Sequence, residues 1–335
     1  MGYPKKALPR HLLFVGLAWC TQSSAADATD PFLYDQEVQI NALSDRKITY
    51  YLDRPTTAQE VPLLIVVDGS GCVGQKRPAL QNLFRPTPNG QRAYARIRVE
   101  KPGVASDSSD LKSSCTEEFS KNYSIDNRVL DHLRVLQHLR ASASWWNGDL
   151  LLWGWSDGGD IAAQITIYYP NVKKSILGAM GGGLTMAEQF EDILICPDSP
   201  ATTDRESCLN EVREQFSRIA DYPTWKETWS GQDSSWRAWN SRLYSRLSNA
   251  LPDVQTPFLV VHGELDHESV PVESARKLIN VLHETGNKHY TYWEIPGMGH
   301  GLNSLPAAEK KKIEDAMLHW LLSDDNANAP PIEEI

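Results

Sequence analysis

The sequence predicts an α/β protein built on a mostly parallel, doubly wound sheet. Short apolar runs that end in glycine alternate with segments whose apolar residues recur at helical spacing. Strands that alternate with helices favour a parallel sheet, because each crossover helix returns the chain to the same end of the sheet. With 335 residues, of which 41% are hydrophobic and 23% charged, the chain can bury one large core that carries an insertion.

The first predicted elements are strands. The segments "EVQINAL" and "KITYYLD" flank Ser44 and Asp45 and have alternating apolar positions, which predicts an antiparallel hairpin. "VPLLIVVDGSG" is a continuous apolar run, as expected of a strand covered on both faces. "YARIRVEKPG" predicts a further strand of the same kind.

Helices and strands then alternate to the end of the chain. Helical spacing from Asn127 to Arg140 leads into "DLLLWGW" and a second helix over residues 158–169. "SILGAMGGG", "PFLVVHGELD" and "YTYWEIPGMGHG" supply further strands, with helices over residues 272–285 and 307–322. The polar tail, residues 323–335, has the composition of a disordered segment.

Residues 184–250 break the alternation and divide the predicted core into residues 26–183 and 251–322. This segment is rich in tryptophan, and Trp236, Trp239, Leu243 and Leu247 form a helical stripe. Such a stripe is typical of core packing. The functional alternative is a helical cap whose aromatic side chains line a pocket. The candidate pocket residues are Trp155, Trp225, Trp229 and Trp236.

The N-terminus has the pattern of a secretory signal peptide. Lys5, Lys6 and Arg10 precede an apolar stretch that is too short to span a bilayer, and small residues follow it. We expect cleavage after Ala25, with Ala28 as the alternative, which assigns residues 1–25 to the signal and the mature protein to the periplasm or the exterior. Cys20 follows a tryptophan where a lipobox needs a small residue, which disfavours a lipoprotein.

Four cysteines remain in the mature chain. They are Cys72, Cys115, Cys196 and Cys208, and an even number in an exported chain suggests disulfides. We favour Cys72 with Cys115 and Cys196 with Cys208, because the second pair closes a short loop and the first ties two loops on one side of the sheet. Four free buried thiols are the alternative.

Charge and spacing exclude several classes of partner. The formal net charge is −10 and no run of basic residues occurs, so a nucleic-acid surface is not expected. No membrane span is expected in the mature chain. No CxxC or Cys/His spacing indicates a zinc site, so we expect no metal and no cofactor. The sequence leaves the oligomeric state open.

Three side chains follow predicted strands at the edge where ligand sites gather in parallel sheets. They are Ser156, Asp266 and His300. Serine, then acid, then histidine is the order that catalytic triads take on this architecture. Ser156 would be the nucleophile, His300 its base, and Asp266 the group that orients His300. The alternatives are a turn serine and a loop histidine.

The turn around Ser156 has the small residues that a sharp strand-to-helix elbow needs. These are Gly154, Gly158 and Gly159. The backbone N–H of Asp157 would donate one hydrogen bond to the oxyanion, and the loop "DGSGC" would donate a second through Gly71 or Cys72. Ser70 also lies between glycines, but no strand-to-helix elbow orients it, so its loop is assigned to oxyanion stabilisation.

Several other polar residues near these motifs have local explanations. Glu264 and Glu268 lie beside Asp266, and an acid at a helix entry could be a capping residue. His262 and His267 would pack or form hydrogen bonds. Asp68 and Asp157 would be structural acids, with a substrate cation as the alternative partner for Asp157.

The motifs "GWSDGG", "HGELDHESVP" and "GMGHG" resemble those of the α/β-hydrolase superfamily, over about residues 37–322. Within it, the chain is similar to the prolyl-oligopeptidase-like and dienelactone-hydrolase-like groups. It departs from the lipase pattern, because its oxyanion loop is "DGSGC" and not "HGGG". The resemblance implies an α/β-hydrolase fold with a Ser–His–Asp triad.

The leading hypothesis is an exported serine hydrolase that cleaves a carboxylic ester through an acyl-enzyme. A small serine peptidase or acylaminoacyl-type amide hydrolase is the second hypothesis. Its substrate would be a short peptide and not a small ester. The third is a noncatalytic binding protein on the same fold. An intact Ser156, Asp266 and His300 argues against it, because a pure binder has no chemical need for all three.

Overall fold

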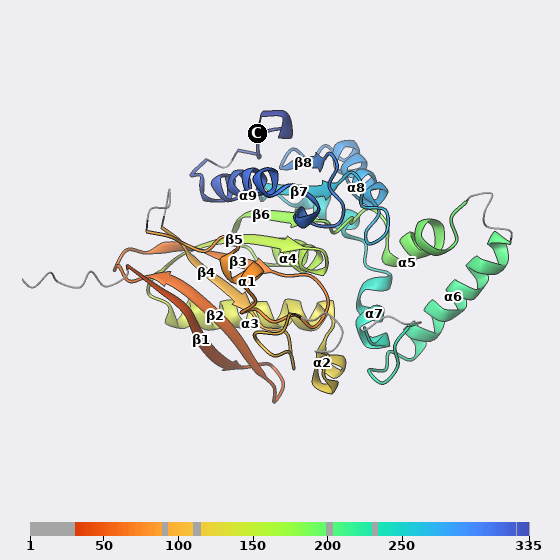
Figure 1. Cartoon of the computed structure of the whole chain (residues 1–335), viewed down its shortest axis with the longest axis horizontal. Helices are drawn as coiled ribbons and strands as arrows, with labels where there is room; N and C mark the ends of the chain where they lie inside the picture. The colour runs from red at the N-terminus through yellow and green to blue at the C-terminus, as the bar shows by residue number, and fades with distance from the viewer. Residues whose placement is uncertain are drawn as a thin grey trace, which may run out of the picture.

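The computed structural model describes residues 31–88, 93–109, 115–198, 204–229, 234–325 and 327–334. The predicted signal peptide lies outside these ranges. In the described chain an eight-stranded sheet has the order β1-β2-β4-β3-β5-β6-β7-β8 (Figure 1). The strands are β1 Phe32–Asn41, β2 Lys47–Pro55, β3 Val61–Val67, β4 Ala95–Val99, β5 Trp146–Trp155, β6 Val172–Gly178, β7 Phe258–Gly263 and β8 Tyr290–Ile295.

The strand pairings confirm the predicted fold class. β1 and β2 pair antiparallel as a hairpin, and β2 pairs antiparallel with β4. All remaining pairs, from β4 through β3 and β5 to β8, are parallel. The carboxyl ends of these parallel strands therefore meet at one edge of the sheet, where the predicted site residues follow β5, β7 and β8.

Helices cover both faces of the sheet. Leu150 and Leu152 of β5 pack in a core with α3 (Ile125–Ser142), α4 (Asp157–Tyr168) and α8 (Val272–Glu284). Leu151 and Trp153 of the same strand pack on the other face, with α1 (Pro78–Asn82) and α9 (Ala307–Leu322). A strand whose alternate residues enter two cores must be apolar throughout, which explains the run "DLLLWGW".

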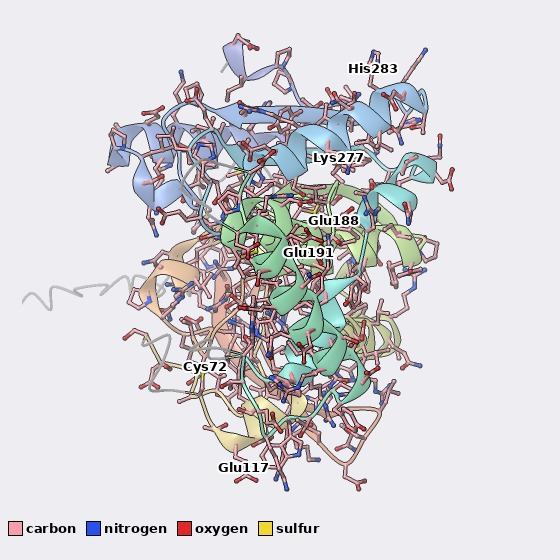
Figure 2. All side chains as sticks on the ribbon, turned by 90° about the vertical axis from the view of Figure 1, so that its right-hand side faces the viewer. Cys72, Glu117, Glu188, Glu191, Lys277 and His283 are labelled. Carbon is pink, nitrogen blue, oxygen red and sulfur yellow. A yellow bond between two sulfur atoms is a disulfide. The ribbon has the colours of Figure 1, made fainter. Side chains whose placement is uncertain are left out.

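The segment predicted as a cap is helical and lies beyond the carboxyl ends of the parallel strands (Figure 1). It contains α5 (Met186–Gln189), a π-helical turn (Phe190–Ile195), α6 (Arg205–Asp221) and α7 (Trp236–Leu243), and two short 3₁₀ turns, Leu247–Asn249 and Leu251–Asp253, lead back to β7. In the turned view α6 lies in front of the sheet (Figure 2). A separate apolar core of residues from α5, α6 and α7 holds the cap together.

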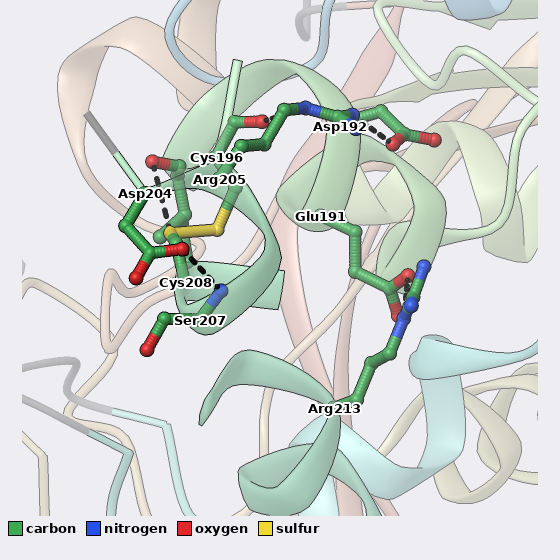
Figure 3. Close-up of a disulfide and its surroundings, with 9 residues drawn as sticks. Glu191, Asp192, Cys196, Asp204, Arg205, Ser207, Cys208 and Arg213 are labelled. Atoms are coloured by element: carbon green, nitrogen blue, oxygen red, sulfur yellow. Dashed lines mark hydrogen bonds and ion pairs between the residues drawn. A yellow bond between two sulfur atoms is a disulfide. The ribbon is translucent and has the colours of Figure 1, made fainter. Parts of the chain in front are cut away.

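A disulfide joins the two parts of the cap. Cys196, at the end of the π-helical turn, is bonded to Cys208 in α6, and their Cα atoms are 5.9 Å apart (Figure 3). Arg205 donates to Asp192 at 2.8 Å beside it. The second disulfide joins Cys72 to Cys115, 43 residues further along the chain. Both bridges are the pairs that the sequence favours.

The described residues of the C-terminal tail contact the edge strand β8, whereas the disorder expected from its composition stays a prediction. Trp293 of β8 donates its indole N–H to Pro330 O at 2.7 Å, and Thr291 donates its hydroxyl to Ala329 O at 2.9 Å. Ala329 is buried against the α9 face of the sheet. These described residues of the tail satisfy polar groups of the edge strand β8, a role that composition does not reveal.

Within the described ranges, no helix is both long and apolar enough to cross a bilayer.

Candidate active site

Ser156 stands at a strained turn between β5 and α4. Its φ is 58° and its ψ is −128°, in a region that a residue with a side chain seldom occupies. A Cβ at Gly154 would lie 2.0 Å from Gly158 O, and one at Gly158 would lie 2.1 Å from Val67 O. A Cβ at Gly159 would lie 2.8 Å from Gly178 O. The elbow predicted from the glycines is therefore a tight crossing of backbones that leaves no room for side chains.

The three predicted triad residues form one chain of hydrogen bonds. His300 Nε2 lies 3.0 Å from Ser156 Oγ, and His300 Nδ1 lies 2.7 Å from Asp266 Oδ2. The side chain of Asp266 is 2% exposed, whereas that of His300 is 32% exposed. This geometry lets a neutral His300 accept the Ser156 proton while Nδ1–H donates to the buried carboxylate.

Asp266 is held as a carboxylate by its neighbours. Burial alone would raise its pKa, but hydrogen bonds from His262 and His300 hold the pKa of Asp266 well below its usual range. The backbone N–H of Val270 adds a third hydrogen bond at 3.2 Å. Glu264 instead accepts from Gly297 N, so it does not compete for His300.

His262 packs and forms a hydrogen bond as the sequence analysis expects, but its position beside Asp266 was not predicted. It is fully buried at the end of β7, and its Nε2 donates to Val270 O at 2.8 Å. The same nitrogen lies 3.5 Å from Asp266 Oδ2. The spacing of four residues between His262 and Asp266 was visible in the sequence, but nothing local showed that both side chains turn inward. His267 is exposed, 3.9 Å from Glu273.

The loop after β3 is fixed beside the nucleophile by buried ion pairs. Arg128 of α3 donates to the carboxylate of Asp68 at 3.1 Å and to Asp68 O at 3.0 Å, and Lys101 binds the other carboxylate oxygen. Burial works against ionisation, yet Lys101 and Arg128 together lower the pKa of Asp68. The disulfide of Cys72 closes the far end of this loop. Asp68 is thus the structural acid that the sequence predicts.

Gly69 is the residue of this loop that contacts the nucleophile. A Cβ at this position would lie 3.1 Å from Ser156 Cβ and 3.6 Å from Ser156 Oγ. The sequence singles out Gly71, which has a φ of 82°, and Cys72, which is buried, as the second oxyanion donor. Ser70 is exposed. The structure therefore adds Gly69 to the part of the loop that approaches Ser156.

The carboxylate of Asp157 has protein partners. Tyr123 donates its hydroxyl to Asp157 Oδ2 at 2.6 Å, and Arg242 of α7 donates to the same atom at 2.7 Å. All three side chains are buried. The cap is thereby tied to the residue that follows the nucleophile. Asp157 is a structural acid as predicted, since Tyr123 and Arg242 both bind its Oδ2 atom.

The predicted pocket tryptophans divide into two groups. Trp229 and Trp236 pack in the core of the cap with Phe190, Phe216 and Trp239, so the packing alternative holds for them. Trp225 lies on the cap surface with Lys121 Nζ 4.6 Å from its ring centroid. Trp155 lines a cavity of about 170 Å³ with its neighbour Trp153. Most aromatic rings of the cap pack against one another. The spacing of these residues in the sequence cannot show whether such rings pack together or line a pocket.

A search of the described residues finds no cluster of three or more histidine, cysteine or acidic side chains able to hold a metal ion.

Comparisons with known proteins agree with this fold. The model of the prolyl oligopeptidase family matches residues 212–325. Esterase LipC of Mycobacterium tuberculosis is 42% identical over 79 residues, which span 24% of this chain and 19% of that esterase. The matched segment is thus a small part of that relative.

Solved structures extend the likeness to most of the chain. Est1E from Butyrivibrio proteoclasticus superposes with a TM-score of 0.55 at 15% identity, covering 85% of this chain and 97% of Est1E. The acylaminoacyl peptidase of Pyrococcus horikoshii superposes with a TM-score of 0.57 at 14% identity, covering 87% of this chain and 41% of that peptidase. At these identities the likeness is one of fold. Together with the family match, it supports an α/β-hydrolase of the serine hydrolase class.

Proposed function

We propose that this chain, an α/β-hydrolase of the prolyl-oligopeptidase-like group, is an exported serine esterase that cleaves a carboxylic ester through an acyl-enzyme. The observation that carries the proposal is the unbroken chain from Ser156 Oγ through His300 to the buried Asp266 carboxylate. The strained backbone of Ser156 supports it, because such strain persists where function over-determines the conformation.

The reaction follows from the positions of these atoms. Ser156 Oγ attacks the carbonyl carbon while its proton passes to His300 Nε2. The backbone N–H of Asp157 and the loop of residues 69–72 stabilise the oxyanion. The C–O bond to the alcohol breaks as His300 returns the proton to the leaving oxygen. Water then attacks the acyl-enzyme by the same route and restores Ser156.

The decisive experiment replaces Ser156 with alanine. We expect hydrolysis of short-chain aryl esters to fall by at least three orders of magnitude, since the residual rate would come from binding and oxyanion contacts alone. A fluorophosphonate probe should label the wild-type protein at Ser156 and leave Ser156→Ala unlabelled. Absence of labelling on folded wild-type protein would favour the noncatalytic binding protein, and unchanged hydrolysis by Ser156→Ala would overturn the assignment.

A peptidase is the second candidate, supported by the family match and by the likeness to an acylaminoacyl peptidase. Recognition of a free amino terminus needs unpaired carboxylates near the nucleophile. The acids around the cavity beside the triad are engaged, Asp68 with Lys101 and Arg128 and Glu314 with Lys310 at 3.7 Å. This favours the ester. Turnover of matched ester and aminoacyl-arylamide substrates on one preparation tests the ranking, and a preference for the amide would reverse it.

Export is supported by the two disulfides together with the N-terminal pattern of residues 1–25. Disulfides persist in oxidising compartments such as the periplasm or the cell exterior. The exported protein should have the mass of a chain cleaved after Ala25, and none of its four remaining cysteines should react with an alkylating reagent before reduction. Four reactive thiols in exported protein would contradict this part of the proposal.

A further inference from the structure

A cavity of about 170 Å³ borders the candidate site on the face of the sheet covered by α1 and α9. Its walls include Gly69 from the loop beside the nucleophile and Gly301 and Leu302, which follow His300. Trp153 and Trp155 of β5 line it from below. The two loops that flank the candidate chemistry are therefore also walls of this cavity.

The tryptophan pair gives the cavity a flat aromatic wall. The rings of Trp153 and Trp155 stack with centroids 5.6 Å apart and an interplanar angle of 21°. Trp155 donates its indole N–H to His300 O at 2.8 Å, which fixes this wall to the backbone of the candidate base. A planar ring of a ligand gains most from such a surface, because offset stacking adds to the apolar area that it buries.

Two polar groups on the cavity-lining residues lack a partner. Trp153 Nε1 and Arg77 Nε are buried, and neither forms a hydrogen bond within the described structure. Arg77, at the start of α1, also has no ion pair among the described residues. Both groups are donors, and neither can accept. A ligand that satisfies this wall must bring acceptors.

The charges around the cavity favour an anion. Four charged residues line it: Asp68, Arg77, Lys310 and Glu314. Asp68 is neutralised by the buried Lys101 and Arg128, and Lys310 lies 3.7 Å from Glu314. Burial also raises the pKa of Glu314. The charge left without a partner is the positive charge of Arg77.

We propose that this cavity binds the leaving-group half of the ester, and that this half is an aromatic ring carrying a carboxylate. The proposal rests on the proposed esterase function and adds the substrate class. The leaving oxygen must receive the proton from His300, so the group that departs lies on the side of Gly301 and Leu302. Cleavage joins the acyl carbon to Ser156 Oγ and releases the hydroxyaryl carboxylate with that proton.

Two matched esters test the proposal on the wild-type protein. 3-Carboxyphenyl acetate and 3-carbamoylphenyl acetate have the same acyl group and leaving groups of similar shape, but only the first is anionic. We expect kcat/KM to favour the carboxylate by about tenfold, the effect of one charged hydrogen bond at a partly exposed site. Arg77→Gln should abolish this preference by raising KM for the carboxylate ester.

Lys312→Gln is the matched control, because Lys312 is an exposed cation on α9 that does not line the cavity. It should keep the wild-type preference, and thermal unfolding should show that both variants are folded. Equal kcat/KM for the two esters, or the same loss in Lys312→Gln, would overturn the proposal. In monophenyl isophthalate the carboxylate is on the acyl half of the ester. If kcat/KM depends on Arg77 only for this ester, the assignment of the cavity to the leaving group is overturned.

A binding measurement separates this inference from the proposed function. 3-Hydroxybenzoate should bind Ser156→Ala and change its tryptophan fluorescence, since Trp153 and Trp155 form the wall. Adding Arg77→Gln to Ser156→Ala should weaken the binding of 3-hydroxybenzoate about tenfold. Benzamide should bind equally to Ser156→Ala and to the double variant. If the protein proves not to hydrolyse esters, this binding should still be observed. No saturable binding to folded Ser156→Ala would refute the site.

Discussion

Two regions of the molecule are each closed by a disulfide yet are held together by different forces. The region proposed to stabilise the oxyanion comprises residues 68–76 with Glu100, Lys101 and Arg128; this oxyanion region is held by buried ion pairs on Asp68 and by Cys72–Cys115. The cap, residues 184–250, is held by edge-to-face aromatic contacts among Phe190, Phe216, Trp229 and Trp239 and by Cys196–Cys208.

The difference shows that the distance of a region from the candidate site constrains which residues hold it together. Directed hydrogen bonds fix a loop to within the tolerance that an oxyanion requires, whereas apolar packing tolerates substitution if volume is kept. The cap can therefore hold its shape with stacked rings, but it is linked to the nucleophile by one directed contact, that of Arg242 with Asp157. Activity should be sensitive to the first region and to this link, and stability to both.

The largest expected effect is on catalysis. Asp266→Asn should lower kcat about 10⁴-fold, because an amide cannot hold His300 in the tautomer that accepts the Ser156 proton. Steady-state ester hydrolysis measures it. Glu268→Gln, an exposed acid in the same loop, should leave kcat unchanged. Comparable losses in both variants would show that the loop, and not the carboxylate of Asp266, matters.

Breaking the link between the cap and the turn at Ser156 should cost stability. Arg242→Met leaves the buried Asp157 carboxylate with only Tyr123, and removal of one partner of a buried pair costs about 3 to 5 kcal/mol. Urea unfolding measures the loss. Arg213→Met, which breaks an exposed pair inside the cap, should cost about 1 kcal/mol or less. Equal losses would remove the distinction between the link and the cap surface.

The two disulfides sharpen the comparison further. Replacing Cys72 and Cys115 with alanine should lower the free energy of unfolding by about 4 kcal/mol, and replacing Cys196 and Cys208 by about 3 kcal/mol, because the second bridge closes a shorter loop. Only the first replacement should reduce kcat. If the replacement of Cys196 and Cys208 lowers kcat while the hydrolase core stays folded, the cap affects the geometry of the candidate site more than its contacts indicate.

The smallest expected effect is a pH dependence of the oxyanion region. Burial, reinforced by Asp68, raises the pKa of Glu100 to about 7. The folded protein therefore keeps a proton that the unfolded chain releases, so the free energy of unfolding falls as pH rises from the ordinary glutamate pKa through 7. Partial exposure limits the loss to about 2 kcal/mol. Glu100→Gln should flatten this slope between pH 5 and pH 8 in chemical denaturation, and an unchanged slope would assign it to another group.

Much of the fold and the candidate site was predictable from local patterns. Apolar runs ended by glycines mark β3, β5 and β7, and the glycines around Ser156 mark the elbow, because both depend on neighbours in sequence. The catalytic roles of Ser156, His300 and Asp266 remain predictions that their hydrogen-bonded geometry supports.

What local patterns missed lies in pairs of distant residues. Arg128 reaches Asp68 across 60 positions, and Arg242 reaches Asp157 across 85. His262 is close to Asp266 in sequence, but its inward orientation depends on the sheet. The hydrogen bonds between the tail and β8 were likewise not predictable from the polar composition of the tail.

The sequence by itself determined the order of strands and helices, the elbow and the two favoured disulfide pairs, because chain-local sterics, spacing and periodicity specify them. Only the tertiary structure decided which tryptophans cover one another and which face a cavity. An apolar stripe in the sequence indicates that one face of a helix is buried. The hydrophobic effect has no direction, so the stripe does not indicate which residues cover that face. Packing placed Trp229 and Trp236 inside the cap and left Trp153 and Trp155 beside the cavity that Gly301 and Leu302 also line.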